Sequence, residues 1–305
     1  MSEIRVGMST PWDLAVLEPE AQRERLRAIA DAGVDHVFTA DHVSFVNGGG
    51  IDAPVRLAAL GGMEPRLGLY LGVYLLALRH PMVAARQFAT LAELAPGRVT
   101  VGVGVGGEDR HEFEACGIDP RTRGRRTDVA LDLVRRLLDG ETVDGDGEFF
   151  DFEAGAIRPT PQPRLPFVVG GRSDAAVERA GRVGDGWLAA WCSPGRFAAA
   201  VALAEETGAA AGRSVDWQHG IQLWIGVDHD RVSARDHVAA GMQNFYGLPF
   251  EAFEKYTPMG RADDVVEFLR PYVEAGATVF NLTPCGPSGP AELEAMAQIA
   301  AGLRR

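Results

Sequence analysis

Short apolar runs alternate with amphipathic stretches along most of the chain. The apolar runs predict β-strands at residues 4–9, 36–40, 67–75, 99–105, 167–169, 187–190, 218–227 and 278–282. The stretches between them repeat apolar residues with a helical period. They predict helices at residues 18–31, 53–60, 81–94, 122–138, 175–182, 196–211, 263–274 and 291–303. The first four strands begin about every 31 residues, which suits one strand-helix unit.

This alternation predicts a parallel sheet covered by helices. Eight such units favour a closed (β/α)8 TIM barrel over an open doubly wound sheet. We therefore expect one α/β domain over residues 1–305, with insertions near 107–121, 140–166 and 228–258. A hairpin is expected at 141–152 within the second insertion, and the third has a less regular pattern. In such a barrel the chemistry lies where the strands end.

Composition narrows the class of protein. The chain has 305 residues, 46% of them hydrophobic and 24% charged, which excludes a disordered or collagen-like protein. Its net charge of -12 argues against binding to nucleic acid or to an anionic membrane. Three scattered cysteines, no long apolar run and no signal-like start predict a cytoplasmic protein.

Asp41 and His42 directly follow the second predicted strand. A histidine there can transfer a proton or bind a polar edge of a cofactor near neutral pH. The pair is our first candidate for catalysis. The alternative is that Asp41 caps a turn and His42 is an ordinary satisfied polar residue.

Glycines mark the third and fourth predicted strands. Gly72-Val73 interrupts a branched apolar run and indicates a bulge or a close approach to a ligand. In the fourth strand, valines and glycines alternate, and we expect the face carrying Gly102, Gly104 and Gly106 to leave free space for a ligand. A dinucleotide fingerprint ending at Gly107 is rejected because its glycines lie inside the strand.

Glu108 opens a charged run at the mouth of the fourth strand and is a candidate acid or base. A solvated charge run is the alternative. After the fifth strand, the turn Gly170-Gly171-Arg172-Ser173 leads into a helix. Its backbone N–H groups and Arg172 would suit a phosphate. Alternatively, Ser173 only caps the helix.

Other chemistries find little support. No HExxH, GxSxG or phosphate-loop motif is present, and Asp228-His229-Asp230 resembles a solvated turn more than a metal site. We therefore predict no metal. Four aromatic residues are candidates for an apolar pocket, although aromatic residues more often belong to a core: Trp191, Phe245, Tyr246 and Phe250.

Several short segments match one known family in a shared order. They are residues 33–37 leading to Asp41-His42, Arg79-His80-Pro81, Gly97-Arg98, residues 112–117, residues 147–152, Gly170-Gly171 and residues 184–187. With them the chain resembles the luciferase-like monooxygenase superfamily, in particular its deazaflavin (coenzyme F420)-dependent oxidoreductase branch. The resemblance covers nearly the whole chain.

The resemblance implies a barrel that holds the cofactor ring at its C-terminal mouth. Asp41 and His42 would approach the ring or the substrate. Gly72-Val73 would form a bulge, often with a non-prolyl cis peptide, beneath one ring face. Gly106, Gly107 and residues 170–173 would hold the ribityl phosphate. Glu108 stands one position away from a catalytic glutamate of some relatives.

The resemblance also implies a function and partners. We expect hydride transfer between reduced F420 and an organic small molecule, with His42 as proton donor or ring-positioning residue. The alternatives are an FMN-dependent monooxygenase supplied by a partner reductase, and a non-catalytic flavin-binding barrel. A homodimer through the helices at 53–60 and 81–94 is expected. Substrate specificity is assigned to the loops at 43–51, 108–121 and 228–257.

Overall fold

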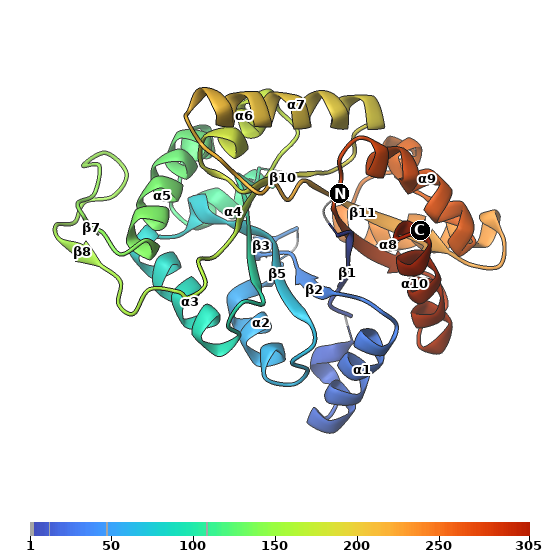
Figure 1. The fold of residues 1–305 in the computed structure, drawn as a ribbon. Helices are drawn as coiled ribbons and strands as arrows, with labels where there is room; N and C mark the ends of the chain where they lie inside the picture. The colour runs from blue at the N-terminus through green and yellow to red at the C-terminus, as the bar shows by residue number, and fades with distance from the viewer. Residues whose placement is uncertain (1–2, 12, 47, 108) are drawn as a thin grey trace.

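In the residues that the structure describes, eight parallel strands close into a barrel (Figure 1). The structure is a computed structural model and describes residues 3–11, 13–46, 48–107 and 109–305. The barrel strands are β1 (Arg5–Ser9), β2 (His36–Thr39), β5 (Gly68–Leu75), β6 (Val99–Gly104), β9 (Phe167–Gly170), β10 (Gly186–Ala189), β11 (Gly220–Val227) and β13 (Val279–Cys285). Neighbours in the ring follow chain order, and β13 pairs with β1 to close it. The predicted TIM barrel is therefore confirmed.

Helices form an outer layer around the strands (Figure 1). They are α1 (Pro19–Asp31), α2 (Ala53–Gly61), α3 (Pro81–Leu94), α5 (Arg123–Leu138), α6 (Asp174–Val183), α7 (Pro194–Ala210), α9 (Ala262–Glu274) and α10 (Pro290–Leu303). Each lies where the helical period predicts one. The main core fills the space between the two layers, where Val101 and Val103 of β6 are buried with Phe88 of α3. No helix in the described ranges is both long and apolar enough to cross a bilayer.

Further elements lie in the connections. They are β3 (His42–Phe45), β4 (Gly49–Ile51), α4 (Arg110–Ala115), β7 (Thr142–Val143), β8 (Gly155–Ala156), α8 (Arg231–Tyr246), β12 (Met259–Gly260) and the 3-10 helices Leu14–Val16, Leu76–Leu78, Pro120–Thr122, Phe250–Ala252 and Glu254–Tyr256. Strands β7 and β8 form a hairpin that projects beyond the barrel (Figure 1). It begins inside the predicted range of 141–152, but its second strand lies beyond residue 152. The assignment of residues 1–305 to one domain with insertions stays a prediction.

Helix α8 corrects the prediction of an irregular segment at 228–257. Asp230 caps its start by accepting hydrogen bonds from the amides of Val232 and Ser233. Its fully buried residues form a narrow stripe at every fourth position, namely Ala234, Val238 and Met242. So narrow a stripe, with polar and glycine residues between its members, gives only a weak helical signal in the sequence.

Strand β6 also corrects a prediction. A Cβ placed on Gly104 would lie 2.5 Å from the side chain of Val73, and one on Gly170 would lie 3.1 Å from it. Val73 therefore fills part of the space above these glycines, whereas Gly104 and Gly106 still line the cavity described below. The predicted bulge and cis peptide bond are both present at Gly72-Val73, where the pairing of β5 with β6 shifts register. The glycines of β6 and β9 make room for that bulge.

Candidate functional site at the carboxyl end of the barrel

Two adjoining cavities open where the barrel strands end. The first, which we name the arginine lobe, measures about 400 Å³. It is lined by Asp41, Gly72, Val73, Leu75, Gly104, Val105, Gly106, Arg123, Gly170, Gly171, Arg172, Ser173, Leu188, Ala189, Ala190 and Trp191. The second, the apolar lobe, measures about 230 Å³ and is lined by Ser9, Thr10, Phe38, Thr39, Val46, Gly49, Gly50, Ile51, Asn244 and Thr283. Both lobes share Ala40, His42, Phe45, Gln222, Trp224, Phe245 and Tyr246.

The two lobes lie on opposite sides of the barrel mouth. The arginine lobe is built on β5, β6, β9 and β10, whereas the apolar lobe is built mainly on β1, β2 and β13. In the ring, β9 is separated from β1 by three strands in either direction. The shared residues, His42 and Gln222 among them, form the seam between the lobes.

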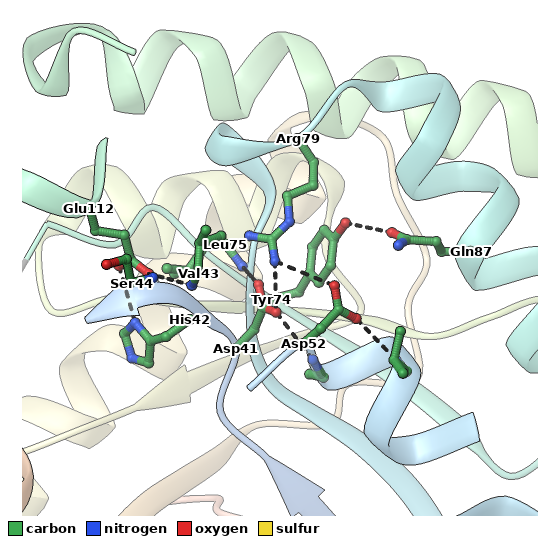
Figure 2. Close-up of polar contacts among 12 residues, drawn as sticks. Asp41, His42, Val43, Ser44, Asp52, Tyr74, Leu75, Arg79, Gln87 and Glu112 are labelled. Atoms are coloured by element: carbon green, nitrogen blue, oxygen red, sulfur yellow. Dashed lines mark hydrogen bonds and ion pairs between the residues drawn. The ribbon is translucent and has the colours of Figure 1, made fainter. Parts of the chain in front are cut away.

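His42 is held at this seam by a residue that is distant in the sequence. Its Nδ1 lies 3.1 Å from Oε2 of Glu112, which also accepts hydrogen bonds from the amides of Val43 and Ser44 (Figure 2). Because a carboxylate can only accept, Nδ1 carries the hydrogen and Nε2 is the ring atom left for chemistry. Phe45 stacks on the ring with centroids 4.2 Å apart.

The Glu112 side chain is only 2% exposed, so its charge depends on these donors. Burial alone raises the pKa of Glu112. The hydrogen bond and charge of His42, with the amides of Val43 and Ser44, overcome that effect and lower the pKa below its ordinary value. The carboxylate therefore stays ionised and orients His42.

Asp41 lies beside His42 but its carboxylate turns to the barrel wall (Figure 2). It accepts hydrogen bonds from the amides of Ala53 and Leu75 and from the guanidinium of Arg79 at 2.9 Å. Burial raises the pKa of Asp41, and Arg79 with the two amides opposes the shift. These contacts tie α2 and β5 to the loop that carries His42, which favours a positioning role for Asp41 over direct catalysis.

The arginine lobe collects donors for an anion. Arg123, at the start of α5, lines it and has an Nε that is buried and without a partner in the described residues. Arg172 lines it too, and its guanidinium lies 5.5 Å from the ring centre of Trp191. Ser173 caps α6, so the amides of that helix start face the same end of the lobe. Together these groups suit a phosphate.

Gly107 leaves room for the Arg123 side chain because it has no Cβ. It has a φ of +115°, and a Cβ there would lie 2.7 Å from Nε of Arg123. A larger residue at this position would push Arg123 aside. Gly107 is not among the residues that line either lobe, so its part in the predicted phosphate site would be to leave room for Arg123. Glu108, the remaining predicted catalytic residue, lies outside the described residues.

A chain of hydrogen bonds forms the floor beneath the seam. His36 Nε2 lies 2.7 Å from Oδ1 of Asn281, whose amide donates to Gln222. Gln222 in turn donates to the carbonyl oxygen of Gly72 at 2.9 Å. The floor therefore fixes the bulge that carries Val73. Burial lowers the pKa of His36 to about 4, so it is neutral at physiological pH.

The structure brings most predicted site residues together. His42, Asp41, Gly72, Val73, Gly106, Gly170, Gly171, Arg172 and Ser173 all line the arginine lobe. Of the aromatic candidates, Trp191, Phe245 and Tyr246 line a lobe, whereas Phe250 belongs to a core cluster. The roles of all these residues stay predictions. Sequence reasoning missed Glu112, Arg123, Gln222 and Trp224, and the only available signal was that residues 112–117 belong to a family motif.

The fold and this site can now be compared with known proteins. A profile of the luciferase-like monooxygenase family matches residues 4–279. The chain belongs to this family. The resemblance drawn from its sequence motifs is thereby confirmed at the level of the family.

Individual relatives match parts of the chain. An uncharacterized protein of Mycobacterium tuberculosis is 33% identical over 174 residues, which are 57% of this chain and 60% of that protein. An F420-dependent glucose-6-phosphate dehydrogenase of Beutenbergia cavernae is 38% identical over 172 residues, 54% of this chain and 50% of that protein. The chain thus spans 50% to 60% of the length of these relatives.

A solved structure matches nearly the whole length. It is an F420-dependent secondary alcohol dehydrogenase in complex with an F420-acetone adduct. The TM-score is 0.84 at 21% identity, with 99% of this chain and 100% of the other covered. At that identity the match establishes the shared barrel fold.

Proposed function

We propose that the protein is an F420-dependent oxidoreductase that transfers a hydride between the deazaflavin and a small organic molecule. The observation that carries the proposal is the divided cavity. One lobe offers two arginines and a helix start to an anionic cofactor, and His42 stands at the border of the second lobe. The names of the relatives described above support F420 as the cofactor.

Different residues would bind the cofactor and transfer the proton. Arg123, Arg172 and the backbone of residues 170–173 would hold the phosphate, and Val73 would support one face of the ring. Bound F420 supplies a carbon that accepts or gives a hydride. In the oxidation of an alcohol, Nε2 of His42 would take the hydroxyl proton. The carbon that bears the hydroxyl would give its hydrogen to F420 as hydride, which leaves a carbonyl group. Reduction of a carbonyl reverses both transfers, and aromatic walls exclude water.

The cavity volume is consistent with this assignment. At about 400 Å³, the arginine lobe lies within the 300–1,000 Å³ that cofactor and ligand pockets usually span. The unpartnered Nε of Arg123 gives an independent sign that an acceptor is expected there, because buried donors normally have partners.

The test is a binding and turnover comparison between F420 and FMN. We expect F420 to bind at least about tenfold more tightly than FMN, a difference of about 1.4 kcal/mol. Reduced F420 should also be oxidised by a carbonyl substrate without oxygen. Tighter binding of FMN together with oxygen-dependent turnover would establish the monooxygenase alternative. Binding of F420 without turnover of any alcohol or carbonyl tested would favour the non-catalytic barrel.

Partners and location stay proposals. Helices α2 and α3 expose Val55 and Val83 at 66% and 53%, which supports the homodimer expected through them. Sedimentation of the purified protein would test it. The three free cysteines, Cys116, Cys192 and Cys285, are consistent with a reducing cytoplasm. A supporting flavin or F420 reductase remains part of the proposal.

A further inference from the structure

The apolar lobe carries information about the substrate. Among the described residues that line it, none is Asp, Glu, Lys or Arg. Its one histidine is His42, at the seam. The arginines of the cavity, Arg123 and Arg172, line the other lobe. An anionic substrate in the apolar lobe would therefore lose its water without gaining a cation.

Most polar side chains of this lobe already have hydrogen-bond partners. The hydroxyls of Thr10 and Thr39 are 2.9 Å apart and hydrogen bonded. The indole of Trp224 donates to the hydroxyl of Tyr246 at 3.3 Å. Gln222 uses its amide nitrogen on Gly72 and its oxygen on Asn281. Among the described residues that line the lobe, Ser9, Asn244 and Thr283 have side chains without such a bond. A sugar, which carries a hydroxyl group on most of its carbons, would have to rely mainly on these three residues.

We propose that the apolar lobe takes a small neutral alcohol or ketone with an apolar body, and that it excludes sugar phosphates. The single oxygen of such a molecule would face Nε2 of His42, and its hydrocarbon part would contact Phe45, Ile51 and Phe245. The volume of about 230 Å³ limits the size of that body. The physical reason for exclusion is that burying a phosphate without a cation is strongly unfavourable.

This inference rests on the proposed function, and its test separates the two. The purified protein is first titrated with F420, and failure to bind would overturn the cofactor assignment alone. Turnover is then compared for cyclohexanol, its anionic analogue 4-hydroxycyclohexanecarboxylate, and glucose 6-phosphate. We expect kcat/KM for cyclohexanol to exceed that of either anion by about 100-fold or more, since a buried unpaired charge is costly. Comparable or better turnover of an anion would overturn the inference, as would turnover of none.

A second measurement does not require the cofactor. Trp224 lines the lobe, so its fluorescence reports occupancy. Cyclohexanone should change the fluorescence at concentrations where the carboxylate analogue has no effect. An equal response to the two molecules would contradict the inference whether or not F420 binds.

The variant Ile51→Arg would introduce a positive charge into the apolar lobe. Ile51 lines the lobe on β4 and pairs with His42 on β3. We expect Ile51→Arg to lower kcat/KM for cyclohexanol about tenfold and to raise it for the carboxylate analogue. The control is Val232→Arg, because Val232 is 71% exposed at the far end of α8 and lines neither lobe. Unchanged preference in Ile51→Arg, with F420 affinity retained, would contradict the inference.

Discussion

The arginine lobe and the apolar lobe share one wall and differ in almost everything else. The first combines Arg123, Arg172 and the capped start of α6. The second is enclosed by aromatic and aliphatic side chains and by hydroxyls that bond each other. Each lobe is built on different strands of the ring, on opposite sides of the mouth. The barrel thus separates recognition of an anion from recognition of an apolar body.

The difference teaches where the chemistry must lie. A reaction between two molecules requires groups that both lobes reach, and His42 is the side chain among the seven shared residues whose type exchanges a proton near neutral pH. Its partner Glu112 lines neither lobe, and neither do Asn281 and His36 below Gln222. The seam is therefore held by residues that need not touch either ligand.

The largest effect is expected at the seam itself. Removing the imidazole in His42→Ala should lower kcat about 10²- to 10⁴-fold, the range for a general acid or base. Affinity for F420 should change little, because the phosphate donors lie in the arginine lobe. Steady-state rates and a cofactor titration measure the two effects. The control His111→Ala removes an exposed histidine next to Glu112, and full turnover of His42→Ala would refute the assignment.

Acid should destabilise the fold through two buried histidines, His36 in the floor and His219 beside Trp187. Burial lowers the pKa of both His36 and His219 to about 4, from 6.5. Between pH 6.5 and 4 these histidines are largely protonated in the unfolded chain but largely neutral in the folded protein. The free energy of unfolding therefore falls as the pH falls through this window. Each histidine should remove about 3 kcal/mol from the free energy of unfolding by pH 4.

Urea unfolding at stepped pH tests this loss. His219 accepts a hydrogen bond from the amide of Trp187, and the oxygen of an asparagine can replace that acceptor. The variant His219→Asn should therefore show about half the pH dependence of the natural chain between pH 6.5 and 4. An undiminished slope in this variant would mean that other groups are responsible.

The sequence predicts those features that depend on residues close together in the chain. Strand periodicity located the barrel, and the position of His42 after β2 and of Gly170 to Ser173 after β9 followed from it. The bulge at Gly72-Val73 was predicted from a glycine within an apolar run and from the family resemblance. Each of these features depends on neighbouring residues in the chain, which is why no structure was needed to find it.

What was missed depends on contacts between distant segments. Glu112 lies 70 positions from His42, and Gln222 lies 150 positions from Gly72. No period in the sequence links such pairs. The glycines of β6 show the same limit, because the side chain that fills their space, Val73, arrives from the neighbouring strand β5. An open face was expected, and Val73 covers part of it while Gly104 and Gly106 still line the arginine lobe.

An intermediate effect is expected in the arginine lobe. Arg123→Ala should weaken F420 binding about 10- to 100-fold, the contribution of a charge-assisted hydrogen bond to a phosphate. The KM for the organic substrate should stay nearly unchanged, because that substrate binds across the mouth. Arg121→Ala is the matched control, since Arg121 is exposed and pairs with Asp119. A larger effect on substrate KM than on cofactor affinity would mean that the lobes are not separate.

The smallest effect concerns the orientation of His42 rather than its presence. In the natural chain, one carboxylate oxygen of Glu112 accepts from the amides of Val43 and Ser44 and the other accepts from Nδ1 of His42. In Glu112→Gln, the side-chain amide has only one oxygen for these contacts. If that oxygen keeps Val43 and Ser44, the amide NH₂ faces Nδ1 and places the ring hydrogen on Nε2, which then cannot accept the proton of an alcohol. We expect kcat for alcohol oxidation to fall about tenfold with F420 affinity unchanged, roughly the value of one charged hydrogen bond. Glu114→Gln, on the exposed face of the same helix α4, serves as control. Equal losses in kcat and F420 affinity would instead indicate that Glu112 only supports the fold of the β3–β4 hairpin, and the seam would then rest on His42 alone.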